Sequence, residues 1–171
     1  MRTLILGGAR SGKSALAERL AAAHDAVLYI ATAAAGDDEM AARILHHRAR
    51  RPAHWQLREA PLQLADTLRA EAHAARCLLV DCLTLWLSNL LCREDEALFA
   101  TQRAALLAAV DDLPGELILV SNEVGQGIVP LGALTRRFVD EAGRLHQDLA
   151  ARCERVVFTV AGLPQLLKGS L

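Results

Sequence analysis

Small residues followed by a lysine and a serine stand near the start of the sequence, in the order G-x-x-x-x-G-K-S. The run is Gly7, Gly8, Ala9, Arg10, Ser11, Gly12, Lys13 and Ser14. Glycines let the backbone curl so that several N–H groups point at a polyphosphate, and the lysine reaches its β- and γ-phosphates. The serine hydroxyl after the lysine is a ligand for Mg²⁺. This P-loop predicts binding of a nucleoside triphosphate, with Ser14 at the metal.

A second candidate is the carboxylate of Asp81, which ends the apolar run 77–80. Beside a P-loop strand, an aspartate at the end of a buried strand orders Mg²⁺ or its water. We therefore predict that Asp81 shares the metal with Ser14. Asn122 and Glu123 follow another apolar run and are candidates for ordering substrate or metal, although a structural turn explains them equally well.

The segment 38–50 is a third candidate, because helical spacing separates its apolar and polar residues. The polar face holds Glu39, Arg43, His46 and Arg50. Two guanidinium groups bind phosphate oxygens and disfavour protonation of a neighbouring imidazole, and a neutral imidazole is a nucleophile. Taken alone, the segment favours a solvated charged face, and His47 borders the same face. A zinc site from His46, His47 and His54 is disfavoured, because adjacent histidines on a helix point about 100° apart.

The elements that position these residues alternate along the chain. We predict strands over Thr3–Leu6, Ala26–Ala31, Cys77–Asp81, Glu116–Ser121 and Arg155–Ala161. We predict helices over Lys13–Ala23, Asp38–Arg50, Leu62–Ala75, Leu83–Leu91, Ala97–Asp111 and Leu134–Arg152. Short strands that are apolar on both faces and separated by helices indicate a three-layer α/β fold with a mostly parallel sheet. Ligands bind at the carboxyl ends of such strands, where the candidate residues fall.

Composition narrows the possible partners. With 171 residues, we expect one domain over 1–171. The net charge of −1 gives no field that would attract nucleic acid or an anionic membrane. The four cysteines show no metal-binding spacing, and the chain leads directly into its first strand, without room for a signal peptide. We therefore expect a cytoplasmic protein with reduced thiols and no membrane insertion.

Further motifs follow the P-loop in a specific order. They are Tyr29–Ala33, Asp38–Met40 with Arg43 and His46, Arg51-Pro52 with Trp55, Glu59 with Pro61, Asp81–Thr84 and Ser121–Pro130. The ordered set resembles the bifunctional adenosylcobinamide kinase/adenosylcobinamide-phosphate guanylyltransferase family of cobalamin biosynthesis. The resemblance runs from the P-loop to Gly162-Leu163-Pro164, nearly the whole chain.

This resemblance implies a P-loop NTPase fold with a RecA-like sheet, a homotrimer, Mg²⁺ and two reactions at one nucleotide site. ATP or GTP first phosphorylates the hydroxyl of the aminopropanol arm of adenosylcobinamide. His46 then attacks the α-phosphate of GTP, releases pyrophosphate, and passes GMP to the corrinoid phosphate to give adenosylcobinamide-GDP. The implied catalytic residues are His46 and Lys13. The implied nucleotide-binding positions are Gly7–Ser14, Ala31, Thr32, Ala33, His47, Arg48, Ala49, Arg50, Glu59 and Asp81.

Several points stay open at this level. His146 stands where the family pattern has asparagine, and Arg136 with Arg137 is either a contact for the corrinoid phosphate or an exposed pair. Two other functions fit a P-loop: a kinase with a single activity, and a non-catalytic nucleotide-switch subunit that acts on a protein partner. Neither the preferred phosphoryl donor nor the corrinoid site is legible in the sequence.

Overall fold

The computed structural model describes residues 1–33, 52 and 54–171. Its strands are β1 (Arg2–Gly7), β2 (Ala26–Ala31), β3 (Gln56–Glu59), β4 (Arg76–Asp81), β5 (Glu116–Asn122), β6 (Arg155–Val160) and β7 (Leu163–Lys168). Its helices are α1 (Lys13–Ala21), α3 (Leu64–Glu71), α4 (Leu83–Leu91), α5 (Glu96–Asp112) and α6 (Ala133–Arg152). The helix predicted over 38–50, with its basic face, lies outside the described residues.

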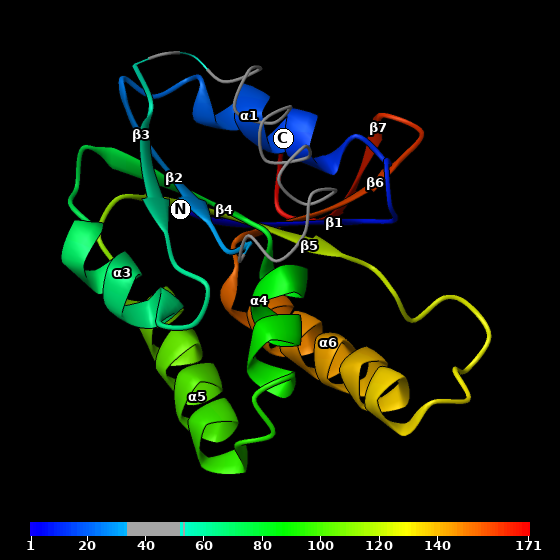
Figure 1. Cartoon of the computed structure of the whole chain (residues 1–171). Coiled ribbons are helices and arrows are strands. Elements are labelled where there is room, and N and C mark those ends of the chain that lie inside the picture. Colours follow the sequence, from blue (N-terminus) through cyan, green and yellow to red (C-terminus); the bar gives the residue numbers. More distant parts are fainter. Residues whose placement is uncertain (34–51, 53) are drawn as a thin grey trace.

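The strands form one seven-stranded sheet in the order β3-β2-β4-β5-β1-β6-β7. Neighbouring strands from β3 to β6 are parallel, and β7 runs antiparallel to β6. Helix α1 lies on one face of the sheet, while α3, α4, α5 and α6 cover the other face (Figure 1). This confirms the predicted three-layer α/β architecture with a mostly parallel sheet. The P-loop strand β1 is separated from β4 by β5 alone.

The apolar side chains of the strands alternate between two cores. In β1, Leu4 and Leu6 pack with the layer of α3 to α6, while Ile5 packs with α1. The same alternation runs through β4, where Leu79 belongs to the α1 core, and through β5, where Leu119 belongs to the opposite one. Burial on both faces explains why these strands are continuous apolar runs in the sequence.

Two strands were not predicted. Strand β3 is short and mostly exposed, and β7 is exposed along its whole length at the sheet edge. The turn between β6 and β7 places Ala161 at φ 51° and Gly162 at φ 79°, the left-handed pair that a tight hairpin needs. Pro164 is accommodated because β7 is an edge strand. The chain after β6 therefore returns along the sheet instead of ending there.

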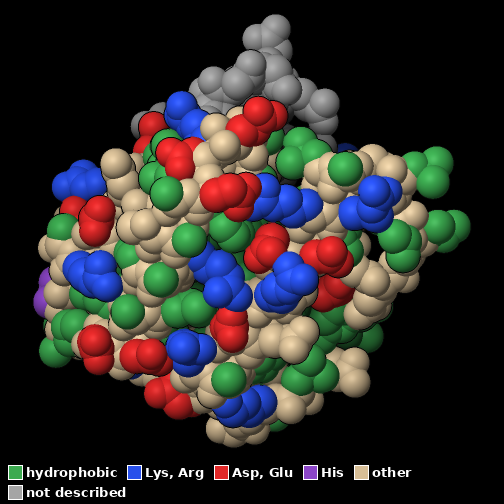
Figure 2. Space-filling model, turned by 90° about the horizontal axis from the view of Figure 1, so that it is seen from below, with side chains coloured by type: hydrophobic (Ala, Val, Ile, Leu, Met, Phe, Trp, Pro, Cys, Tyr) green, Lys and Arg blue, Asp and Glu red, His purple; other side chains and the backbone are tan. Residues whose placement is uncertain are grey.

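Ion pairs link the two helices that form the outer face of the helical layer. Arg103 with Asp148, and Arg152 with Asp111, join α5 to α6. Arg137 donates to both carboxylate oxygens of Glu96 at 2.5 and 2.6 Å. Figure 2 shows charges of both signs interspersed over this face. Arg136 is exposed, whereas Arg137 is half-buried and engaged by Glu96.

The buried thiols are protected from ionisation by their surroundings. Burial raises the pKa of Cys77 and of Cys153 to about 12, and it also raises the pKa of Cys82. All four cysteines are free thiols. No helix among the described residues has the length and apolar character needed to cross a membrane.

Candidate active site

The P-loop is a tightly packed turn that connects β1 to α1. A Cβ atom on Gly7 would lie 2.5 Å from the Thr159 carbonyl oxygen, and one on Gly12 would lie 2.9 Å from the Gly162 Cα. Gly12 has a φ of 95°, which side chains rarely adopt, and the Gly162 N–H donates to the Ser11 carbonyl at 2.8 Å. The β6–β7 turn, which the sequence did not predict, therefore packs against the P-loop.

Lys13 is directed back over this loop. Its side chain is nearly buried, and Nζ donates to the Gly8 carbonyl at 3.2 Å. Gly12 precedes α1 without a side-chain cap, so the first N–H groups of the helix have no side-chain oxygen to pair with. A helix N-terminus of this kind, with a lysine beside it, is suited to bind the phosphates of a nucleotide.

Asp81 lies at the carboxyl end of β4, in the same layer as α1. Cys77 and Leu79, which alternate with the other residues of β4, belong to the α1 core. The Tyr29 hydroxyl donates to Asp81 Oδ2 at 3.1 Å. Mg²⁺ is usually held by one or two carboxylates together with substrate phosphates and waters. The donor set of Asp81 and Ser14 fits this pattern once a triphosphate is bound.

We expect Asp81→Asn to raise the Mg²⁺ concentration needed for half-maximal activity by about 10-fold or more. The substitution removes the carboxylate charge and keeps an oxygen that can accept from Tyr29, so the thermal unfolding midpoint should change little. The measurement is the initial rate against Mg²⁺ concentration, with Asp66→Asn on the exposed face of α3 as the matched control. An unchanged Mg²⁺ dependence would show that Asp81 is structural.

The other predicted nucleotide positions within the described residues gather at the neighbouring strand ends. Ala31 ends β2 and pairs with Glu59, the exposed last residue of β3. The Thr32 hydroxyl is fully buried, donating to the Cys82 carbonyl at 2.6 Å and accepting from the Cys82 N–H at 3.0 Å. Its side chain therefore ties the end of β2 to the end of β4. The predicted residues His46, His47, Arg48, Ala49 and Arg50 lie outside the described residues.

A buried polar network at the end of β5 was not predicted. His146 Nε2 lies 2.8 Å from Ser121 Oγ, which lies 3.3 Å from Thr84 Oγ1, and Thr84 Oγ1 accepts from the Asn122 N–H at 2.6 Å. His146 Nδ1 lies 3.6 Å from Glu123 Oε2. The available signal was the spacing of His146 on α6, because Ala142, Leu145 and Leu149 form the buried stripe that includes it.

Burial lowers the pKa of His146, and this effect outweighs the opposing one of Glu123. The unfolded chain therefore binds a proton at this histidine more readily than the folded one, so the free energy of unfolding should fall as the pH drops below about 6.5. The contribution of His146 to that slope is at most about 1.4 kcal/mol per pH unit. Denaturant titrations of wild type and His146→Asn between neutral and acidic pH measure it, and equal slopes in both proteins would contradict the assignment.

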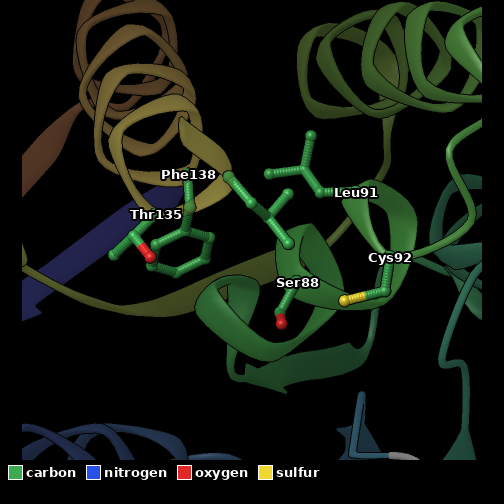
Figure 3. A pocket seen from close by; sticks show the side chains of 6 residues that line it. Ser88, Leu91, Cys92, Thr135 and Phe138 are labelled. Atoms are coloured by element: carbon green, nitrogen blue, oxygen red, sulfur yellow. The ribbon is translucent and has the colours of Figure 1, made fainter. Parts of the chain in front are cut away.

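An apolar groove opens between the end of α4 and the start of α6. Figure 3 shows Ser88 and Leu91 from α4, with Cys92 directly after it, facing Thr135 and Phe138 from α6, and Leu134 completes the lining. The adjoining loop carries apolar side chains in full contact with solvent: Ile128 is 98% exposed and Leu131 is 97% exposed. Large exposed apolar side chains of this kind indicate a surface for association.

Comparisons with known proteins agree with this geometry. A family profile described as "Cobinamide kinase / cobinamide phosphate guanyltransferase" matches residues 3–167. The bifunctional adenosylcobalamin biosynthesis protein CobP of Pseudomonas aeruginosa is 68% identical over 170 residues, covering 99% of this chain and 98% of that protein. The Escherichia coli protein CobU, named in the same words, is 40% identical over 181 residues, covering 98% of this chain and 100% of that protein.

A solved ATPase from a bacterial type III secretion system shares the fold. It has a TM-score of 0.55 and 10% identity, and the match covers 92% of this chain and 50% of that chain. At this identity the likeness supports the architecture alone. The profile match and the high identity to CobP decide the relationship: the chain belongs to the CobU family of cobinamide kinases/cobinamide phosphate guanyltransferases.

Proposed function

We propose that this chain is a bifunctional enzyme of cobalamin biosynthesis that phosphorylates adenosylcobinamide and then converts the product to adenosylcobinamide-GDP. The observation that carries the proposal is the P-loop with Lys13 folded over it, in a chain 68% identical to a bifunctional adenosylcobalamin biosynthesis protein. Both reactions need the same groups, because each makes a phosphorus atom of a bound triphosphate electrophilic.

In the first reaction, the substrate hydroxyl attacks the γ-phosphate of ATP or GTP, and the nucleoside diphosphate leaves. Lys13 and the first N–H groups of α1 bind and orient the phosphates. Mg²⁺ bound by Ser14 and Asp81 would supply charge neutralisation to the phosphate oxygens. In the second reaction, His46 attacks the α-phosphate of GTP and pyrophosphate leaves, and the corrinoid phosphate then takes the GMP from His46 and frees the imidazole. Nucleotide contacts at Ala31, Thr32, Ala33, His47–Arg50 and Glu59 belong to the same proposal.

A mass measurement and a parallel label-transfer assay test the proposal. Intact protein incubated with GTP and Mg²⁺ should gain the mass of one GMP group, and label from γ-labelled ATP should move to cobinamide in a parallel assay. A phosphorylated corrinoid without any protein adduct would indicate a kinase with a single activity. Neither product, together with nucleotide-dependent capture of a protein partner, would indicate a switch subunit.

We further propose that the chain forms a homotrimer through the loop that precedes α6. The side chains of Ile128, Val129 and Leu131 project into solvent, and Leu134 lines the groove beside Phe138. Association through this loop would bury apolar area that is costly to leave exposed. Light scattering on wild type and on an Ile128→Lys, Leu131→Lys double variant tests this. A monomeric wild type would contradict the proposal.

The remaining partners and the location follow from charge and composition. With a net charge of −1 and mixed signs over the helical face, we propose that the protein binds neither nucleic acid nor membrane and works in the cytoplasm as one catalytic domain over 1–171. Filter binding with duplex DNA and flotation with anionic vesicles should both be negative.

A further inference from the structure

Glu123 is attached to the same turn of the P-loop that holds Lys13. Its backbone N–H donates to the Gly7 carbonyl at 3.0 Å. The next carbonyl along the chain, that of Gly8, accepts from Lys13 Nζ at 3.2 Å. The carbonyls of Gly7 and Gly8 therefore hold the backbone of Glu123 and the ammonium group of Lys13 at neighbouring positions of the P-loop.

The Glu123 side chain lies on the opposite side of the sheet edge from the P-loop helix. Lys13 begins α1, and Asp81 follows strand residues that pack against α1. Glu123 instead faces α6, with Oε2 3.6 Å from His146 Nδ1. In phosphoryl transfer, the attacking and leaving oxygens lie roughly in line across the phosphorus atom. If the P-loop and Lys13 hold the leaving diphosphate on the α1 side, an in-line acceptor hydroxyl approaches from the other side, where the Glu123 carboxylate lies.

The buried network gives His146 a defined tautomer. The Asn122 N–H is only a donor, and it bonds to Thr84 Oγ1. When Thr84 in turn donates to Ser121, and Ser121 donates to His146 Nε2, every hydroxyl proton in the series has an acceptor. The single proton of the neutral ring then resides on Nδ1, facing the Glu123 carboxylate.

The reverse order leaves this network unsatisfied. If His146 Nε2 donated to Ser121, the bare lone pair of Nδ1 would face the negative charge of Glu123, and Nδ1 has no hydrogen-bond partner among the described residues that could donate to it. Burial also keeps the ring neutral, since it lowers the pKa of His146. The present 3.6 Å separation exceeds a hydrogen bond, and catalytic contacts of this kind commonly shorten when substrate binds.

We propose that Glu123 is the general base of the kinase reaction and that His146 is the residue that positions it. The inference rests on the proposed function. The hydroxyl oxygen of the acceptor forms a bond to the γ-phosphorus, and the bond from that phosphorus to the β–γ bridging oxygen breaks. The bridging oxygen leaves with its electron pair on the nucleoside diphosphate. The hydroxyl proton passes to Glu123, which later releases it to water.

Substitutions at Glu123 separate this role from a structural one. Oε1 accepts from the Gly125 N–H at 2.6 Å, and glutamine keeps that acceptor while removing the base. We expect Glu123→Gln to lower the kcat for corrinoid phosphorylation by about 100-fold or more, with little change in KM. Glu123→Ala should be equally defective. If Glu123→Gln has the wild-type kcat while Glu123→Ala is impaired, Glu123 only holds the loop, and the proposal is wrong.

Two substitutions at His146 provide a matched pair. The amide of asparagine reaches the position of ring Nδ1, and that of glutamine reaches the position of Nε2. His146→Asn therefore keeps a donor toward Glu123. His146→Gln keeps only the group that bonds to Ser121 and loses the donor toward Glu123. We expect His146→Asn to retain most of the wild-type kcat and His146→Gln to lose roughly 10-fold, with KM unchanged in both. The exposed His73→Gln is the control for replacing a histidine.

Guanylylation of each variant by GTP shows whether the nucleotide site is intact. If wild type neither phosphorylates cobinamide nor forms the GMP adduct, the proposed function fails, and Glu123 is not at issue. If wild type does both and Glu123→Gln phosphorylates cobinamide at the wild-type rate, this inference alone fails. Equal kcat values for His146→Asn and His146→Gln would overturn the positioning role.

Discussion

Replacing His46 by alanine is expected to abolish guanylyl transfer and to leave substantial kinase activity. Guanylyl transfer proceeds through a covalent bond that only a nucleophilic side chain can form, and the resemblance assigns that bond to His46. The kinase reaction needs only positioning and charge stabilisation around the γ-phosphate, which the P-loop provides. The measurement is protein-bound label from α-labelled GTP, compared with the rate of corrinoid phosphorylation.

The neighbouring histidine is the matched control. His47→Ala should keep both activities at reduced efficiency, because His47 is assigned to nucleotide binding. A histidine–GMP bond is a phosphoramidate, so the wild-type adduct should survive alkali and be released by acid, unlike an ester on serine or threonine. If His46→Ala accumulates label at the wild-type rate, the nucleophile is another residue. Loss of label in His47→Ala alone would assign the role to His47.

Replacing Lys13 by alanine is expected to reduce both half-reactions by about 100-fold or more. The reason is that we assign one ammonium group to both reactions: its Nζ lies 3.2 Å from the Gly8 carbonyl, over the loop proposed to bind the triphosphate. Because the side chain is nearly buried, its charge acts on the phosphates with little screening by water. The rates of cobinamide phosphorylation and of adduct formation should be measured on the same preparation.

Arg19→Ala is the control for Lys13→Ala, because Arg19 lies on the same helix with an exposed side chain. It should leave both rates near wild type. The thermal unfolding midpoint of Lys13→Ala should be close to that of wild type, since the lysine makes one hydrogen bond to a loop carbonyl. Wild-type kinase activity in Lys13→Ala, with guanylylation lost, would contradict a shared nucleotide site.

Local patterns were enough to predict much of the fold. The five predicted strands are present as β1, β2, β4, β5 and β6, with ends that differ by at most a residue. The P-loop could be recognised in the sequence because its spacing and its place between a strand and a helix are both local features of the chain. The boundaries of α4 also match the prediction, since an apolar run with helical length is a local signal.

Strand β7 could not be predicted from local patterns. Its sequence contains Pro164 and has no buried side chain, so nothing in it resembles a core strand. It forms because the left-handed turn at Ala161 and Gly162 returns the chain alongside β6. The same turn places Gly162 against Gly12 of the P-loop, about 150 residues earlier in the sequence.

The sequence by itself determined the P-loop motif, where the central strands run and, through its ordered motifs, the family. Only the tertiary structure decided which polar residues share a site. Thr84, Ser121 and His146 come from three separate elements, and each alone is an unremarkable residue in an apolar stretch. They meet because parallel strands bring their carboxyl ends to one edge, where α4 begins and α6 packs. Contacts between residues far apart in the chain depend on that packing, and no local pattern encodes them.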